Sequence, residues 1–91
     1  MRYVIAYDIA DERRRARLAA ALLDFGRRIE ESVFLASVDE ELAAEMRQRI
    51  QTIIELSEDC VHVFALCGAC DARTEVYGRA ELPEDKAFYV L

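Results

Sequence analysis

The chain opens with an apolar run that ends on a carboxylate, and this run restricts the fold more than any other stretch. Residues 2–9 read Arg-Tyr-Val-Ile-Ala-Tyr-Asp-Ile. Because side chains alternate along an extended strand, the run has two sides, Tyr3, Ile5 and Tyr7 against Val4, Ala6 and Asp8. Both sides are mostly apolar, so we expect a central strand of a sheet covered on both faces, with helices on one of them. Asp8 then lies at the carboxyl end of the strand, where α/β proteins tend to present ligands and chemistry.

The chain continues with a helix and a second extended stretch. Residues 12–25 carry an apolar stripe at helical spacing, with Asp11 as a suitable N-cap and Gly26 as a left-handed stop. Residues 27–36 are predicted to form one strand, although two adjacent glutamates in its middle interrupt the alternation. A bulge or an exposed edge would account for these two acids.

A second helix is predicted to begin near residue 37. Ser37-Val38-Asp39-Glu40 has the spacing of a capping box, and an apolar face follows with Leu42, Met46, Ile50 and Ile53. On the solvent side of this helix, Glu45 and Arg49 form an i,i+4 pair. The rest of the chain is predicted to form a strand at 60–66, a loop at 67–70, a strand at 73–79 and a short apolar strand at 87–91.

We expect these elements to form an α+β, ferredoxin-like βαββαβ fold with an additional short C-terminal β-strand, and residues 1–91 to form a single domain. Such a sheet carries both helices on one face. The opposite face here has apolar residues from strands 2–8 and 60–66, so we expect a sheet-to-sheet homodimer that buries about 1,600 Å². The tail at 88–91 would add to the edge of the partner's sheet.

Composition restricts the class of protein further. The hydrophobic content of 54% is high for a chain of 91 residues, which again favours a homo-oligomer. No apolar run approaches the ~20 residues that cross a bilayer, and the N-terminus lacks the pattern of a signal peptide. We therefore expect a cytoplasmic protein that does not contact a membrane. Three cysteines without a secretory context indicate reduced thiols.

The net charge of −6 is unevenly distributed along the chain. Residues 1–36 carry seven arginines and six acids, whereas residues 37–91 carry five bases and twelve acids. Six arginines bracket the first predicted helix, in Arg13-Arg14-Arg15-Ala16-Arg17 and in Arg27-Arg28. Guanidinium groups suit phosphate oxygens, so this helix is a candidate nucleic-acid surface. On composition alone, a solvated helix face is the alternative interpretation.

Seven short motifs are distributed along the chain: Tyr7-Asp8-Ile9, the arginine-rich start of the first helix, Gly26, Arg28-Ile29, Ser32-Val33-Phe34, residues 66–70 and Leu82-Pro83-Glu84-Asp85. Together these motifs resemble the Cas2 family of CRISPR-associated proteins. The resemblance thus covers nearly the whole chain. It implies a ferredoxin-like homodimer in antiviral defence with a metal-dependent endonuclease activity on RNA or double-stranded DNA. It also implies a structural role as the partner of the CRISPR integrase subunit when new spacers are acquired.

The resemblance assigns roles to individual residues as well. Asp8 matches the acidic residue that binds the metal, Tyr7 matches the aromatic residue before it, and Phe34 matches a second aromatic residue of the catalytic set. The nucleic-acid-binding basic residues of the family match Arg15, Arg17 and Arg28. One departure is a glutamate at position 30, where many relatives carry glutamine, and another is the overall acidity, which opposes DNA binding.

The implied metal chemistry makes physical sense only in a dimer. Magnesium commonly takes one or two protein carboxylates, keeps several waters and completes its octahedron with a phosphate. Two copies of Asp8 across a two-fold axis would share one Mg2+ or Mn2+ ion, which would polarise the scissile phosphate and activate a water. Without a cation the two carboxylates would repel, so one of them would be protonated, and metal binding should rise with pH.

Each of these residues also has a purely structural interpretation. Asp8 is suited to capping the following turn or helix, and Tyr7 and Phe34 are suited to a core or an interface. His62 has no catalytic assignment. Cys67 and Cys70 have a spacing typical of zinc or redox sites, but the chain offers no second pair of cysteines. A non-catalytic adaptor that guides DNA, a toxin-like ribonuclease and a small-ligand regulatory domain stay open as alternatives.

Overall fold

The computed structural model describes residues 1–73, 75–77, 89 and 90. Its main sheet has the order β2-β3-β1-β4, and every neighbouring pair is antiparallel. A separate pair, β5 and β6, is parallel. The elements in chain order are β1 (Arg2–Asp8), α1 (Glu12–Leu22), β2 (Gly26–Glu30), β3 (Val33–Ser37), α2 (Glu40–Ile53), β4 (Cys60–Leu66), α3 (Gly68–Ala72), β5 (Glu75–Val76) and β6 (Tyr89–Val90).

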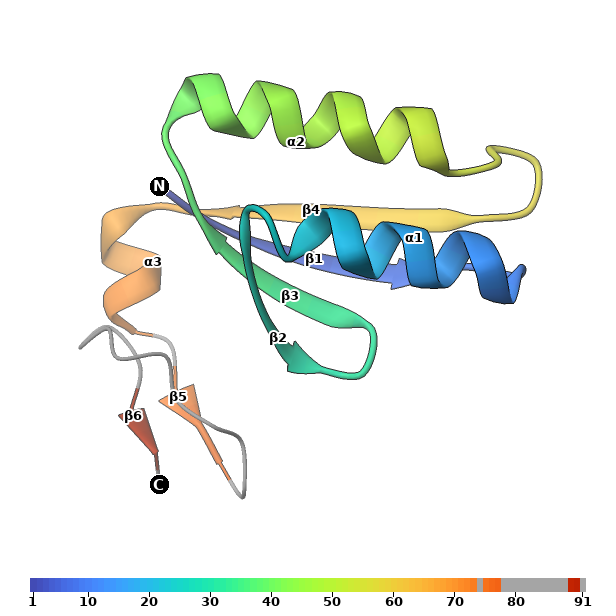
Figure 1. Cartoon of the computed structure of the whole chain (residues 1–91). Helices are drawn as coiled ribbons and strands as arrows, with labels where there is room; N and C mark the ends of the chain where they lie inside the picture. The colour runs from blue at the N-terminus through green and yellow to red at the C-terminus, as the bar shows by residue number, and fades with distance from the viewer. Residues whose placement is uncertain (74, 78–88, 91) are drawn as a thin grey trace.

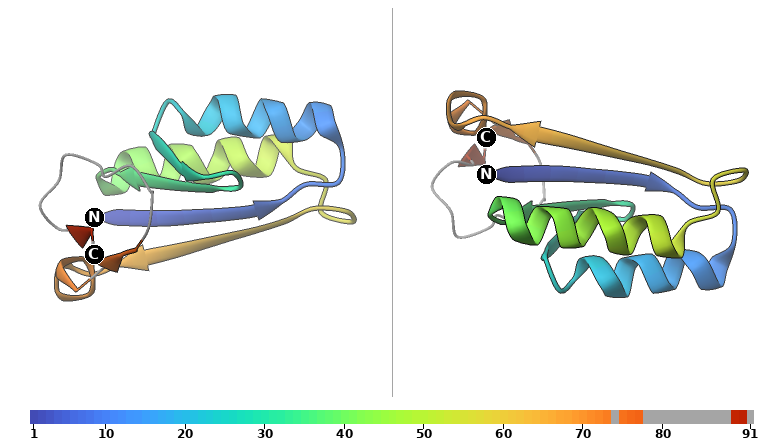
Figure 2. Two further views of the ribbon diagram at one scale, coloured as in Figure 1. Left: turned by 90° about the horizontal axis from the view of Figure 1, so that it is seen from below. Right: turned by 90° about the horizontal axis from the view of Figure 1, so that it is seen from above.

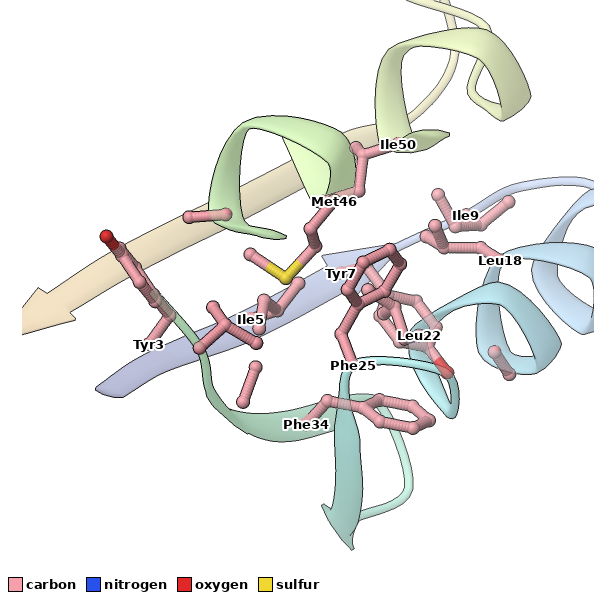
Figure 3. Close-up of a cluster of buried hydrophobic side chains, with 14 residues drawn as sticks. Tyr3, Ile5, Tyr7, Ile9, Leu18, Leu22, Phe25, Phe34, Met46 and Ile50 are labelled. Atoms are coloured by element: carbon pink, nitrogen blue, oxygen red, sulfur yellow. The ribbon is translucent and has the colours of Figure 1, made fainter. Parts of the chain in front are cut away.

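The two long helices lie side by side on one face of the main sheet (Figures 1 and 2). The helices cover this face because side chains alternate along β1. Tyr3, Ile5 and Tyr7 all point to the same side of the strand and are buried in the core beneath the helices. Figure 3 shows these side chains meeting Leu18, Leu22, Phe25, Met46 and Ile50 from the helical layer and Phe34 from β3. The expected ferredoxin-like α+β fold and the central position of the first strand are therefore confirmed.

The predicted single strand at 27–36 is wrong, because this segment is a hairpin of β2 and β3. Its turn lies at Glu31 and Ser32, where the Ser32 carbonyl accepts a 3.0 Å hydrogen bond from the amide of Tyr7. A register shift between Arg28 and Glu30 supplies the expected bulge. The two adjacent glutamates thus mark the end of one strand and the reversal of the chain. This hairpin gives the second and third strands of the βαββαβ order.

Gly26 has a different role from the one predicted. Helix α1 ends at Leu22, its C-cap Leu23 has right-handed φ and ψ, and Gly26 already belongs to β2. A Cβ at Gly26 would overlap the carbonyl oxygen of Leu35 and lie 2.7 Å from Cα of Ala36. Glycine is therefore required because two backbones approach closely here.

The start of α2 also differs in detail from the prediction. Its N-cap is Asp39, whose carboxylate accepts a 2.8 Å hydrogen bond from the amide of Leu42, and Ser37 is still part of β3. Leu42 faces solvent and Ala43 faces the core instead. The expected pair of Glu45 and Arg49 is present at 3.9 Å. The first helix has the predicted cap, since Asp11 accepts from the amide of Arg14 at 2.9 Å.

After β4, which has its predicted bounds, the chain leaves the main sheet (Figure 1). The expected loop at 67–70 is mostly the start of the short helix α3. Of the strand predicted at 73–79, the structure has Glu75–Val76 as β5 and leaves Arg73 and Tyr77 outside it, while residues 74, 78 and 79 lie outside the described residues. The short C-terminal strand β6 pairs with β5 of the same chain, and its addition to a partner's edge stays a prediction. None of the helices in the described part of the chain is long and apolar enough to span a bilayer.

The face of the sheet away from the helices is called the open face here. The cross-strand register puts Val4, Ala6 and Asp8 of β1 on this face together with Phe64, His62 and Cys60 of β4. Leu35 of β3 shares the face and is buried within the chain. Phe64, by contrast, is 54% exposed. The part of the open face that remains accessible therefore extends along β4 to the end of β1 that carries Asp8.

Candidate nucleic-acid and metal site

Asp8 is an exposed carboxylate at the carboxyl end of β1, on the open face. Its cross-strand partner is Cys60 at the start of β4. Within the described residues, its side chain makes no hydrogen bond or ion pair, and helix α1 is capped by Asp11 instead. The structural interpretation of Asp8 as a cap is therefore wrong, and its oxygens are available to a ligand.

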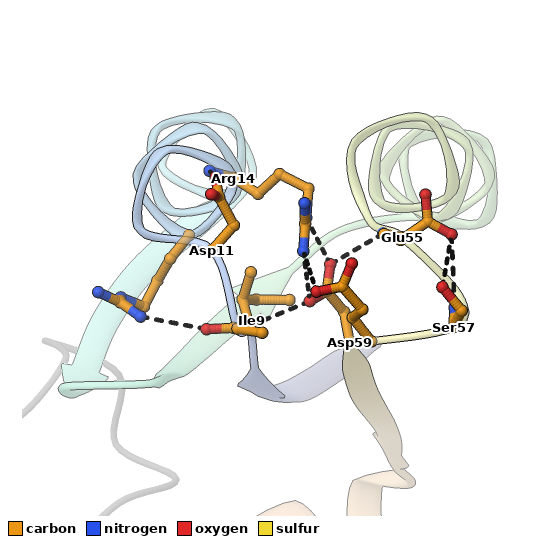
Figure 4. Close-up of polar contacts among 9 residues, drawn as sticks. Ile9, Asp11, Arg14, Glu55, Ser57 and Asp59 are labelled. Atoms are coloured by element: carbon orange, nitrogen blue, oxygen red, sulfur yellow. Dashed lines mark hydrogen bonds and ion pairs between the residues drawn. The ribbon is translucent and has the colours of Figure 1, made fainter.

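A second carboxylate near the same end of the sheet, Asp59, is fully engaged (Figure 4). It accepts hydrogen bonds from the amide of Ala10 at 3.0 Å and from the amide of Glu55 at 2.8 Å. Two more come from the guanidinium group of Arg14, at 2.8 and 3.1 Å. The Arg14 hydrogen bonds, followed by those from the two amides, hold the pKa of Asp59 far below its usual range, although burial opposes them.

Asp59 ties together three segments around the end of the sheet. These are the loop after β1, the first turn of α1 and the loop that leads from α2 into β4. Since Cys60 pairs directly with Asp8, this anchor fixes the strand end that presents the Asp8 carboxylate. Sequence reasoning missed Asp59, because its partners Ala10 and Arg14 are 49 and 45 positions away. The only local signal is the polar run Glu55-Leu56-Ser57-Glu58-Asp59 between helix and strand.

The arginines at the start of α1 have different surroundings. Arg14 binds Asp59, and Arg15 is half-buried and donates a 3.1 Å hydrogen bond to the carbonyl of Ile9. Arg13 and Arg17 are exposed. Of the three arginines predicted to bind nucleic acid, Arg15 and Arg28 are brought together by the fold, whereas Arg17 lies outside their shared hollow.

That hollow, called the arginine hollow here, lies between α1 and the β2–β3 hairpin and has a volume of about 270 Å³. The hydroxyl of Tyr7 points toward the hairpin and approaches the carbonyl of Glu31 at 3.5 Å. Two arginines and two glutamates line the hollow, so its formal charge is balanced. Its lining residues are Tyr7, Glu12, Arg15, Ala16, Ala19, Arg28, Glu31 and Ser32.

The two candidate aromatic residues belong to the core. Phe34 has no exposed surface and Tyr7 is 6% exposed, with their ring centroids 6.2 Å apart. Within this chain the Phe34 ring has no surface for a substrate to contact, and its part in catalysis stays a prediction. The ring does contact Arg28, whose guanidinium carbon lies 5.4 Å from the ring centroid. Tyr7 lines the arginine hollow.

Asp8 and Tyr7 therefore lie on opposite faces of the sheet, although they are adjacent in the chain. Among the described residues, no three His, Cys, Asp or Glu side chains come together to hold a metal ion. Asp8 offers a single carboxylate, which fits the need of Mg2+ for one or two protein oxygens beside water and phosphate.

A family model described as "CRISPR associated protein Cas2" matches residues 1–74. The chain is 36% identical to "CRISPR-associated endonuclease Cas2 2" of Thermus thermophilus over 89 residues, which is 98% of this chain and 94% of the relative. It is 33% identical over 91 residues to "CRISPR-associated endoribonuclease Cas2 4" of Rhodospirillum rubrum, which is 99% of this chain and 73% of the relative.

Solved structures agree with these sequence comparisons. The crystal structure of a hypothetical protein from Thermus thermophilus superposes with a TM-score of 0.81 at 36% identity, over 91% of this chain and 96% of the other. The crystal structure of Streptococcus pyogenes Cas2 at pH 6.5 gives a TM-score of 0.75 at 26% identity, over 86% of this chain and 100% of the other.

Proposed function

Because the chain belongs to the Cas2 family of CRISPR-associated proteins, we propose that it is a metal-dependent endonuclease of RNA or double-stranded DNA. The names of its relatives, endonuclease and endoribonuclease, support a nuclease role. The single observation that carries the proposal is the exposed Asp8 carboxylate, which has no partner among the described residues. An unpaired carboxylate on a rigidly held strand end is suited to bind a cation.

The proposed active form is a homodimer in which two open faces meet. The exposed Phe64 and the half-buried Val4 and Ala6 supply the apolar surface for this contact. Asp8 lies on the same face, so a two-fold axis near the strand end brings one carboxylate from each copy toward a shared Mg2+ or Mn2+ ion. The bound ion would polarise the scissile phosphate and lower the pKa of a water.

The nucleic acid in this proposal passes over the end of β1. Asp8 lies on the open face, whereas Tyr7 and the arginine hollow lie on the other side of the sheet, so the nucleic acid has to pass around the strand end to contact both. Arg15 and Arg28 would hold phosphates there, and the exposed Arg17 would extend the contact along α1. The guanidinium of Arg28 also contacts the Phe34 ring, which would help to orient it toward a phosphate.

A non-catalytic adaptor of the CRISPR integrase subunit is the second candidate function. The observation that favours it is that Asp8 is the single available carboxylate at the strand end within the described residues, because Asp59 is saturated by Arg14 and two amides. The arginine hollow and Arg17 would then position DNA for spacer acquisition in the cytoplasm without cutting it. The two roles are compatible in one protein.

The test compares Asp8→Asn with the parent in cleavage of RNA, single-stranded DNA and double-stranded DNA with Mg2+ or Mn2+. We expect at least a ~100-fold loss of cleavage with an unchanged melting temperature, since Asp8 has no structural partner to lose. The matched control is Asp24→Asn, an exposed acid that forms a surface ion pair with Arg49 far from this strand end. Equal cleavage by the parent and Asp8→Asn would contradict a catalytic role, and spacer integration assayed with the integrase would then test the adaptor.

A further inference from the structure

Beside Asp8, the open face carries a thiol and an imidazole that face one another. Cys60 and His62 occupy positions i and i+2 of β4, so both side chains lie on the open face, and both are exposed. The Cys60 sulfur lies 3.6 Å from Nδ1 of His62. Neither residue has a part in the proposed nuclease chemistry. We propose that this pair binds one thiophilic divalent cation, of which Zn2+ is the natural representative.

The separation of the two atoms is the first argument. Zinc binds a thiolate at about 2.3 Å and an imidazole nitrogen at about 2.0–2.1 Å, so two such ligands of a tetrahedral ion lie about 3.6 Å apart. Cys60 and His62 show this separation without rearrangement. Water would complete the coordination, because no third His, Cys, Asp or Glu among the described residues joins the pair to form a metal-binding group.

The orientation of the imidazole is the second argument. The ring of His62 stacks on the ring of Phe64 with centroids 5.9 Å apart and an interplanar angle of 7°. This contact fixes the ring plane with Nδ1 toward the thiol, and a ligand held in place in advance loses less entropy when it binds.

The neighbourhood of Asp8 gives the site a consequence for the enzyme, and this step rests on the proposed function. Asp8 is directly opposite Cys60, and the Cβ atoms of such cross-strand pairs lie about 4.5–5.5 Å apart. A divalent cation on Cys60 and His62 would therefore put positive charge beside the carboxylate that the catalytic Mg2+ needs. We expect Zn2+ to inhibit cleavage through this pair.

Cobalt(II) is a suitable probe, because it takes the ligands of zinc and a bound thiolate gives it a charge-transfer band in the near ultraviolet. Titrating Co2+ into the reduced parent should produce this band, and Cys60→Ser should abolish it. His62→Gln should keep the thiolate and weaken binding at least tenfold. Cys67→Ser is the matched control, since Cys67 is the other exposed thiol of the described residues, and it should bind like the parent.

A band of equal strength in Cys60→Ser, its loss in Cys67→Ser, or no band in the parent would overturn the site. Asp8→Asn should abolish cleavage and keep the cobalt band, so failure of the proposed function and failure of this site are distinguishable. Zinc should inhibit cleavage by the parent and by Cys67→Ser but not by Cys60→Ser. Equal inhibition of all three would contradict the inhibitory role of the pair.

Discussion

Phe34 of β3 and Phe64 of β4 belong to the same sheet and have opposite surroundings. Phe34 faces the helices and has no exposed surface, whereas Phe64 faces away from them and is 54% exposed. The acids near the end of β1 differ in the same way. Asp59 is bound by donors that include Arg14 of the helical layer, while Asp8 on the open face is unpaired within the described residues. The helical side of the molecule thus holds the fold together, and the open face is left available for partners and ions.

The largest expected effect comes from removing the core ring. Phe34→Ala should lower the free energy of unfolding by about 3–5 kcal/mol, because it leaves a cavity between the sheet and α1 and removes the support for Arg28. Domains of this size are stable by only about 5–15 kcal/mol, so the variant should be close to unfolding at room temperature. Urea unfolding followed by circular dichroism measures the change.

Phe64→Ala is the control for that measurement, since it removes the same ring from the open face. Its unfolding free energy should change by less than about 1 kcal/mol once the contribution of dimerisation is separated by measuring at several protein concentrations. Equal destabilisation by the two substitutions would mean that both faces contribute to the fold alike, which contradicts the comparison.

The helical side was predicted well from the sequence, because its strands and helices follow from local patterns such as strand alternation and N-cap residues. The alternation of Tyr3, Ile5 and Tyr7 identified the central strand, and Asp11 was correctly identified as the first N-cap. The bounds of β4 also agree with the prediction. The hairpin between β2 and β3 was missed because its turn at Glu31 and Ser32 contains no glycine, proline, asparagine or aspartate to mark it.

The candidate site was harder to predict, because it depends on contacts between segments far apart in the sequence. The adjacency of Tyr7 and Asp8 suggested one site, but a strand sends neighbouring side chains to opposite faces. The run of arginines likewise suggested equivalent side chains, although Arg14 binds Asp59 while Arg15 uses one nitrogen for the carbonyl of Ile9 and lines the arginine hollow. Only the fold distinguishes Arg14, which binds the protein, from the arginines proposed to bind a phosphate.

An intermediate effect is expected from Asp59→Asn. An asparagine amide would present a donor to the guanidinium of Arg14 in place of an accepting oxygen, so at least one hydrogen bond is lost at a site where the side chain is shielded from water. The melting temperature at pH 7 should fall by about 5–10 °C. Asp8→Asn, an equal change on the open face, should leave it within about 2 °C.

The pH dependence of this difference provides a second measurement. The pKa of Asp59 is depressed in the folded chain by its hydrogen bonds from Arg14, so folding is favoured by its ionised form. This stabilisation is fully present above the ordinary carboxyl pKa of about 4 and is lost as the pH falls toward the lower folded value. The gap between the melting temperatures of the parent and Asp59→Asn should therefore be constant from pH 7 to about pH 5 and narrow below about pH 4. A gap that widens in acid would contradict this assignment.

The smallest effect on folding, and the largest on assembly, is expected from Phe64→Ser. Phe64 is 54% exposed in the single chain, so its burial at the proposed interface should contribute about half of the 1.5–3 kcal/mol of a full phenylalanine side chain. The substitution removes one ring from each copy, so the dissociation constant of the proposed dimer should rise about 10- to 150-fold. Sedimentation velocity over a range of concentrations measures this change. Leu56→Ser is the matched control, because Leu56 is 84% exposed in the loop before β4 and lies outside the open face. If Leu56→Ser dissociates the dimer and Phe64→Ser does not, the two chains associate through the loop between α2 and β4. The Asp8 side chains of the two copies would then not meet.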